Sequence, residues 1–106
     1  MKAIYKAPGK AAEIIDIEDT LKALQKAVGG PIEAVRVTAE HVVFCHEEGR
    51  LLGLPKNTEI FGIDFVGPIL IVSVDGESFS DVTRPGALLG DAGRLRITKT
   101  DRRRRA

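Results

Sequence analysis

The side chains best suited to metal binding or nucleophilic catalysis lie close together in the chain, at His41, Cys45 and His46. Imidazole and thiolate groups are preferred ligands of zinc, which structural sites hold in a tetrahedron. If this stretch is a strand, alternation places His41 and Cys45 on one face and His46 on the other. A zinc site would then need further ligands from Glu40, Glu47 or a second chain. We therefore predict no metal site here.

Cysteine catalysis needs a thiol whose pKa is lowered and a base that is positioned beside the sulfur. Cys45 lies in an apolar run, which raises the pKa of a thiol, and His46 is predicted to face away from it. The paired acids Glu47 and Glu48 are typical of a solvated turn, and Asp19 is typical of a helix cap. The sequence therefore predicts no catalytic residue and no cofactor, and it favours a protein that is not an enzyme.

The glycine-bearing stretch that follows these residues is the best candidate for a binding site. It is not a phosphate loop of the nucleotide-hydrolysing kind, because no such glycine pattern follows a strand and opens a helix. Exposed backbone N–H groups beside Arg50 and Lys56 would suit a small anionic ligand. The alternative is that the glycines simply form tight turns. The candidate ligand-binding residues are Glu48, Gly49, Arg50, Gly53, Pro55, Lys56 and Asn57.

Charge is distributed unevenly along the chain. Residues 94–106 hold seven basic residues and one acidic residue (+6), whereas residues 1–93 hold nine basic and 14 acidic residues (−5). A terminal run of arginines can bind the phosphates of nucleic acid, although this run has no interleaved aromatic side chains for base stacking. A solvated tail, or a contact with the acidic body of a second copy, are the alternatives. The candidate nucleic-acid-binding residues are Arg102, Arg103, Arg104 and Arg105.

The composition fits a single globular domain. The chain has 106 residues, of which 43% are hydrophobic but only 5% are aromatic, so its core must be aliphatic. We predict one α+β domain over residues 1–99 and a basic, disordered tail over residues 100–106. A lone cysteine cannot form an internal disulfide, and no apolar run reaches the roughly 18 residues of a membrane span. A cytoplasmic location is therefore expected.

The element with the clearest boundaries is an amphipathic helix over about residues 20–28. Apolar side chains recur at i, i+3 and i+7 from Leu21, and polar side chains occupy the opposite face. Asp19 or Thr20 is the expected N-cap, and the pair Gly29-Gly30 is expected to end the helix. The helix therefore has one apolar face to pack on a sheet.

Most of the remaining chain predicts antiparallel β-strands. Residues 40–57 are expected to form a hairpin around a turn at Gly49, since two β-rich arms flank it. The alternation of residues 32–38 slips by one position, which indicates either a bulge or burial on both faces. Residues 69–74 are the most hydrophobic run and are expected inside the sheet. The other predicted strands are residues 2–6, 12–17, 59–66, 78–79 and 94–98. Together these elements predict an α+β fold, in which one helix packs on a mostly antiparallel sheet.

Several short motifs occur in a recognisable order. They are Val28-Gly29-Gly30 with Ile32-Glu33, then Glu47-Glu48-Gly49 with Gly53-Leu54-Pro55 and Asn57, and finally Gly67 before Ile69–Val72. In this order the chain resembles the domain-of-unknown-function family 3846 over about residues 1–75. The chain departs from the resemblance at His46, where Asn is expected, and after Asp75, where a helical C-terminus is expected. The resemblance implies a small accessory protein of phages, plasmids and other mobile elements of bacteria, with no catalytic residue to carry over.

These observations predict a non-enzymatic binding protein of a phage or mobile element. Its expected ligand is a small anionic, nucleotide-like molecule or a component of a host defence. Binding of either would serve counter-defence against the host. The alternative is a nucleic-acid-associated protein that acts through Arg102–Arg105. Unpaired sheet edges also favour a homo-oligomer. No membrane partner is expected.

Overall fold

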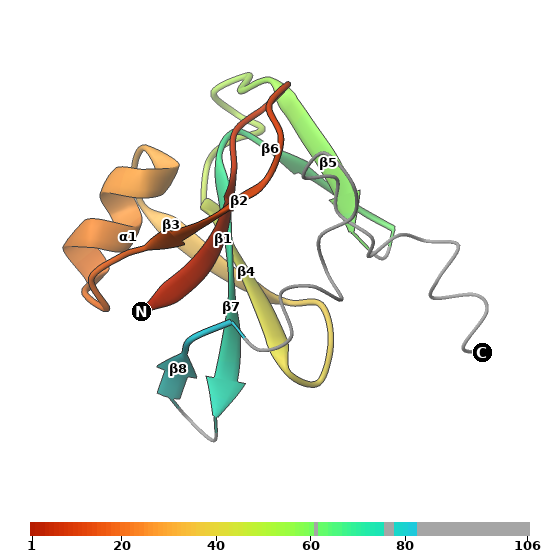
Figure 1. Ribbon diagram of the computed structural model, residues 1–106. Coiled ribbons are helices and arrows are strands. Elements are labelled where there is room, and N and C mark those ends of the chain that lie inside the picture. The colour runs from red at the N-terminus through yellow and green to blue at the C-terminus, as the bar shows by residue number, and fades with distance from the viewer. Residues whose placement is uncertain (61, 76–77, 83–106) are drawn as a thin grey trace.

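The computed structural model describes residues 1–60, 62–75 and 78–82, which form antiparallel β-sheets with one short helix packed on them (Figure 1). The main sheet has six strands. Five of them follow the order β2-β1-β7-β4-β3, and the sixth, β8, pairs with β7 outside this order. Its strands are β1 (Lys2–Lys6), β2 (Glu13–Asp16), β3 (Ile32–Arg36), β4 (His41–His46), β7 (Ile69–Asp75) and β8 (Ser78–Ser80). A second, two-stranded sheet contains β5 (Lys56–Ile60) and β6 (Ile63–Val66). The predicted α+β fold class is confirmed.

Helix α1 (Leu21–Val28) begins and ends at the expected signals. The Thr20 hydroxyl accepts a hydrogen bond from the backbone N–H of Ala23 at 3.2 Å, so Thr20 is the N-cap. Gly29 follows the helix with a φ of 90°, a left-handed conformation that favours glycine, and its N–H donates to the Gln25 carbonyl at 2.8 Å. The local sequence therefore defines the helix at both ends.

Strand β7 is the centre of the main sheet, and it pairs with β1 on one side and β4 on the other. Residues 69–72 are fully buried because each face of the strand is covered by a different layer. Leu70 and Val72 pack with Leu24 and Val28 of α1, on what we call the helix face. The prediction that residues 69–74 lie inside the sheet is confirmed.

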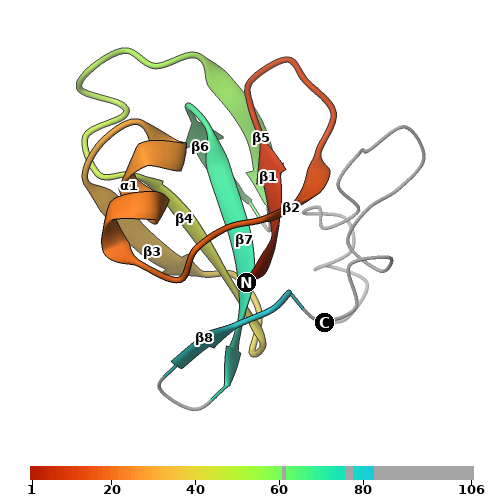
Figure 2. The ribbon, with the colours of Figure 1, turned by 60° about the vertical axis from the view of Figure 1, so that its left-hand side comes forward.

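The opposite side of the sheet, which we call the hairpin face, is covered by the β5–β6 hairpin. Ile60 and Phe65 from this hairpin join Ile69 and Ile71 of β7 in one buried cluster. Figures 1 and 2 show α1 and the β5–β6 hairpin on different sides of β4 and β7. The sheet is thus covered by a helix on one face and by a strand pair on the other.

The predicted hairpin over residues 40–57 is wrong. Strand β4 pairs with β3 on one edge over residues 42–46 and with β7 on the other over residues 41–44, and it does not pair with the chain that follows Gly49. That chain instead closes its own turns, with hydrogen bonds from the Leu52 N–H to the Glu48 carbonyl and from the Leu54 N–H to the Gly49 carbonyl. The next strand, β5, begins at Lys56 and pairs with β6.

Two further strand predictions need correction or completion. Residues 59–66 are not one strand: the chain bends between Ile60 and Ile63, which are partners in the β5–β6 register, and Gly62 in the bend has a φ of 82°. Strand β3 pairs with β4 in an unbroken register, so its irregular pattern is not a bulge, and one half-buried side chain packs on each face. Ile32 packs on the helix face and Val35 packs on the hairpin face.

The remaining predictions concern the N-terminal hairpin and the C-terminal part of the chain. Strands β1 and β2, which match the predicted strands over residues 2–6 and 12–17, form an N-terminal hairpin, and β8, which matches the predicted strand over residues 78–79, pairs with β7. The predicted strand over residues 94–98, the domain end at residue 99 and the tail over residues 100–106 lie outside the described residues. In the part that the structure describes, no helix combines the length and apolar character needed to span a membrane.

Candidate ligand-binding pocket

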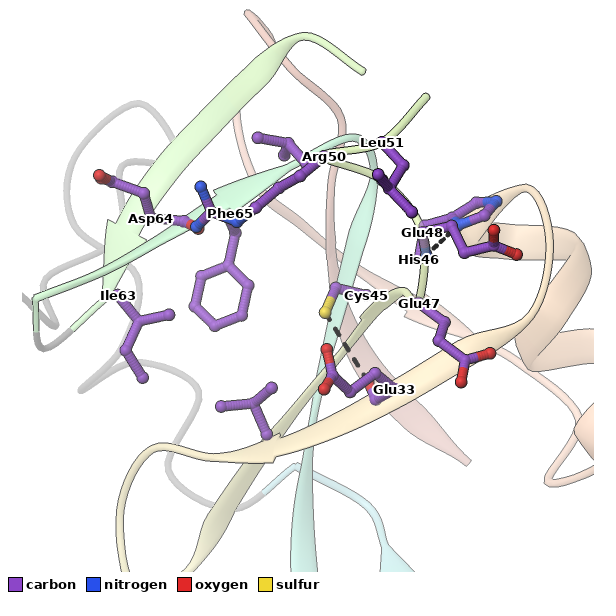
Figure 3. Close-up of a pocket in the computed structure, with 13 residues that line it drawn as sticks. Glu33, Cys45, His46, Glu47, Glu48, Arg50, Leu51, Ile63, Asp64 and Phe65 are labelled. Carbon is purple, nitrogen blue, oxygen red and sulfur yellow. Dashed lines mark hydrogen bonds between the residues drawn. The ribbon is translucent and has the colours of Figure 1, made fainter. Parts of the chain in front are cut away.

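A pocket of about 240 Å³ opens between the 47–55 turn and the β5–β6 hairpin (Figure 3). We call it the turn–hairpin pocket. Its walls come from three places: the ends of β3 and β4, the start of the turn, and strand β6. Segments that are separated by up to about thirty positions in the sequence therefore meet at one site, on the hairpin face of the main sheet.

Four carboxylates and one guanidinium group surround this pocket. The acidic side chains are Glu33, Glu47, Glu48 and Asp64, and the basic side chain is Arg50. All five are exposed to solvent. Nη2 of Arg50 donates a hydrogen bond to the backbone carbonyl of Asp64 at 2.6 Å, so the guanidinium joins the turn to β6. The pocket therefore carries an excess of negative charge.

Apolar side chains form the other part of the pocket wall. Phe65 is a buried lining residue, whereas Leu51 is 84% exposed and Ile63 is 38% exposed. Figure 3 shows Cys45 and Phe65 facing the interior, with His46 turned away from it. Exposed aliphatic side chains beside a pocket are available for contact with an apolar part of a ligand or partner.

The turn at the pocket entrance is held by its own backbone. The Glu47 N–H donates to the Pro31 carbonyl at 2.8 Å, and the Glu48 N–H donates to Nδ1 of His46 at 3.0 Å. The Gly49 N–H donates to the His46 carbonyl at 3.2 Å. These three amide groups are consequently engaged within the protein, and the Arg50 side chain is the cationic group at this part of the turn.

Gly49 is required where the turn passes β6. A Cβ atom at this position would lie 2.9 Å from Cγ2 of Val66, closer than real Cβ contacts. Gly67, at the far end of β6, has a φ of 72°, and a Cβ there would lie 2.7 Å from Cδ1 of Leu54. The two glycines therefore allow the turn to pack directly on the hairpin.

The seven residues predicted to bind a ligand separate into two groups. Glu48, Gly49 and Arg50 line the turn–hairpin pocket. The other four, which do not line it, are Gly53, Pro55, Lys56 and Asn57. The Pro55 carbonyl accepts a hydrogen bond from the Gly67 N–H at 2.8 Å, and the exposed Lys56 ammonium lies 3.9 Å from the Asp64 carboxylate. The structure thus brings together three of the seven predicted residues.

Cys45 and the two histidines have separate surroundings. The Cys45 thiol is buried, and Sγ lies 3.8 Å from the Glu33 carbonyl oxygen. Burial raises the pKa of this thiol, the Glu33 carboxylate raises it further, and Arg50 lowers it. The His46 ring lies against Gly30, and Nδ1 of His41 lies 2.9 Å from the Thr38 hydroxyl.

These positions agree with the alternation expected for β4. Val43 and Cys45 belong to the cluster on the hairpin face, whereas Val42 and Phe44 belong to the cluster on the helix face. Over residues 1–60, 62–75 and 78–82, no group of three or more histidine, cysteine, aspartate or glutamate side chains is arranged to hold a metal ion.

Sequence reasoning missed the residues that β3 and β6 contribute to the pocket. Glu33 and Val35 come from β3, and Ile63, Asp64 and Phe65 come from β6. The only signal for them was strand alternation, which indicated that these side chains share faces but not that the two strands lie on opposite sides of one pocket. The candidate Arg102–Arg105 lies outside the described residues.

The fold and the pocket define a small α+β protein in which a helix and a strand pair cover the two faces of an antiparallel sheet. Residues 1–87 match the family described as domain of unknown function DUF3846. The chain belongs to this family, and the match extends beyond the residues on which the resemblance was based. Neither the comparison with curated proteins nor the comparison with solved structures gave a match.

Proposed function

We propose that this chain is a non-enzymatic binding protein of a phage or other mobile element, and that its ligand occupies the turn–hairpin pocket. The observation that carries the proposal is the lining of this pocket, where exposed Leu51 and Ile63 lie beside charged side chains. Concave sites that combine apolar walls with a few charged groups are typical of ligand binding. The mobile-element origin rests on what the family resemblance implies.

The state of the potential catalytic groups supports binding rather than catalysis. A nucleophilic cysteine needs a lowered pKa, but burial and Glu33 raise the pKa of Cys45. The His46 imidazole accepts a hydrogen bond from the Glu48 N–H through Nδ1 and packs against Gly30, away from the thiol. Neither group is therefore prepared for nucleophilic or general base catalysis at the pocket.

The charge of the pocket favours a ligand with a cationic group. Four carboxylates outnumber the Arg50 guanidinium and the Lys56 ammonium that lies beside Asp64, so an anionic, nucleotide-like ligand would meet net repulsion here. A host protein that presents a basic side chain next to an apolar one would meet both the carboxylates and the exposed Leu51. Of the ligands expected from the sequence, a host defence component of this chemistry is the one we propose.

Titrations of the full chain, followed by the chemical shifts of its backbone amides, test this proposal. The basic probe is a capped tripeptide with one arginine between two leucines, and the anionic probes are cyclic and linear nucleotides. We expect the tripeptide to shift the amides of Glu33, Leu51 and Asp64. The double variant Glu47→Gln with Asp64→Asn should weaken this binding. The matched control, Glu13→Gln with Glu18→Gln, removes two carboxylates that do not line the pocket and should leave binding unchanged.

Two results would contradict the proposal in different ways. If nucleotides bind and Arg50→Ala abolishes their binding, the ligand is anionic and the charge argument is wrong. If none of the probes changes the chemical shifts of the pocket amides, the pocket is not a binding site for these ligand classes and the proposed binding function is wrong. The cytoplasmic location and the homo-oligomer expected from the sequence stay predictions.

A further inference from the structure

We propose that the basic C-terminal segment of this chain, residues 94–106, docks in the turn–hairpin pocket and competes there with the ligand. This inference rests on the proposed function, because it names the regulation of the same site. The pocket is lined by four carboxylates and one guanidinium, while residues 94–106 carry a charge of +6. Opposite charges at this density attract each other over about a Debye length.

The end of the described chain lies on the correct side of the sheet for this contact. Val82 is buried in the same cluster as Cys45 and Phe65, which line the pocket. Its N–H donates to the Lys2 carbonyl at 2.9 Å, which fixes the point from which the chain continues. The described chain therefore ends on the hairpin face, where the pocket opens.

The remaining chain is also long enough. Twenty peptide bonds separate Val82 from Arg102, and an extended chain spans at most about 3.3–3.6 Å per residue, or roughly 70 Å in total. The longest extent of the molecule is 36 Å. The segment can therefore reach the pocket of its own molecule without being fully extended, and it can also reach a second copy.

The sequence of the segment matches both parts of the pocket wall. Arg94-Leu95-Arg96-Ile97 alternates basic and apolar side chains, and the run Arg102–Arg105 adds four guanidinium groups. Guanidinium groups bind carboxylates through paired hydrogen bonds, and the aliphatic side chains can pack on the exposed Leu51 and Ile63. Because it has both basic and apolar side chains, the C-terminal segment suits this pocket better than a partner that offers basic side chains alone.

The contact is expected to be weak and reversible. Exposed ion pairs contribute only about 0.2–1 kcal/mol each, and salt screens them. Covalent attachment compensates for this, because it gives the segment an effective concentration in the millimolar range near the pocket. A ligand of moderate affinity can therefore displace the segment, so docking raises the ligand concentration needed for binding without blocking the site.

A spin label at the end of the full chain tests the docking. The variant Ala106→Cys accepts a nitroxide, while buried Cys45, with its raised pKa, reacts slowly at neutral pH. We expect the label to broaden the amide signals of Glu33 and Asp64 at low salt, but not that of Lys22 on α1. About 0.5 M salt, where the screening length is roughly 4 Å, should restore the signals.

The matched variant replaces all four residues Arg102–Arg105 by glutamine and keeps the label. Broadening at the pocket should then fall at least about twofold, since most of the attraction is removed. Mixing labelled chains with isotope-enriched unlabelled chains distinguishes docking within one molecule from docking between copies; either result supports the inference. Unchanged broadening in the glutamine variant, or no broadening at the pocket at low salt, would overturn it.

The failure of this inference can be separated from the failure of the proposed function. If the glutamine variant binds the arginine tripeptide with unchanged affinity and the label never broadens pocket signals, the binding function stands and the docking is wrong. If the label broadens pocket signals but the glutamine variant binds no tripeptide, the docking stands and the binding function fails. If a DNA or RNA oligonucleotide binds the segment and the label does not broaden the amide signals of the pocket, the segment binds nucleic acid and the docking is wrong.

Discussion

The side chain of Asn57 is held to Lys6 by two hydrogen bonds, although the two residues are 51 positions apart. Nδ2 of Asn57 donates to the Lys6 carbonyl at 2.9 Å, and Oδ1 accepts from the Lys6 ammonium at 2.8 Å. Nδ2 also donates to the Gly67 carbonyl at 2.7 Å. Asn57 thus joins the end of β1 to both ends of the β5–β6 hairpin, and its polar atoms are engaged in holding the fold.

Asn57→Ala should lower the free energy of unfolding by about 2 kcal/mol, because two partly buried carbonyls lose their donor. Lys6→Met removes the ammonium but keeps the aliphatic stem and both carbonyl bonds, so it should cost less than about 1 kcal/mol. Urea unfolding of the two variants measures both values. If Lys6→Met is the more damaging change, the carbonyl contacts are not what holds the hairpin.

Gly30 and His46 form the second contact that can be tested. A Cβ at Gly30 would lie 2.5 Å from Nε2 of His46, whose ring is buried and also accepts the Glu48 N–H. Gly30→Ala should therefore destabilise the protein by about 1–3 kcal/mol. In the background of His46→Ala the same substitution should cost much less, since the ring is gone. A double-mutant cycle with a coupling near zero would show that the ring moves aside freely.

Arg50 closes the turn–hairpin pocket from the turn side. Because its guanidinium donates to a backbone carbonyl of β6, Arg50→Ala breaks this bond, whereas Asp64→Asn leaves it in place. The stability change should stay within about 1 kcal/mol, since the contact is exposed. We expect faster hydrogen exchange of the Leu52 and Leu54 amides in Arg50→Ala and unchanged exchange in Asp64→Asn. Equal exchange in both variants would mean that the turn is held by its backbone bonds alone.

The elements that the sequence predicted well are those with local signals. Helix α1 was bounded by a polar cap and a glycine pair, and β7 was recognisable because burial on both faces demands a continuous apolar run. The separation of His46 from Cys45 also followed from strand alternation alone. Each of these features depends on residues that are close in the sequence.

Pairing between strands depends on partners that are distant in the sequence, and the predicted hairpin over residues 40–57 was wrong for this reason. The turn at Gly49 has the composition of a hairpin, but β4 is already paired on both edges, by β3 and by β7. The same limit applies to the pocket. Arg50 was predicted as a site residue, whereas Asp64 was not, because their contact depends on how the β5–β6 hairpin folds back over the sheet.

The thiol of Cys45 gives a prediction for the dependence of stability on pH. Burial and the Glu33 carboxylate raise its pKa in the folded state above the ordinary value of about 8.5. Between the unfolded and the folded pKa the native state holds more protons than the unfolded state, so stability must fall as pH rises through this range. Below the unfolded pKa both states hold the proton, and the thiol adds no pH dependence.

Other groups also titrate at alkaline pH, so the measurement compares the native chain with Cys45→Ala. The difference in unfolding free energy between them should be constant up to about pH 8 and should then shrink as the native chain loses stability. The rate of alkylation of Cys45 should likewise rise at a higher pH than that of a free cysteine. Glu33→Gln removes the second cause of the raised pKa and should move the alkylation profile to lower pH. A profile that matches free cysteine, or that does not respond to Glu33→Gln, would contradict the buried, unactivated thiol on which the proposed non-enzymatic function depends.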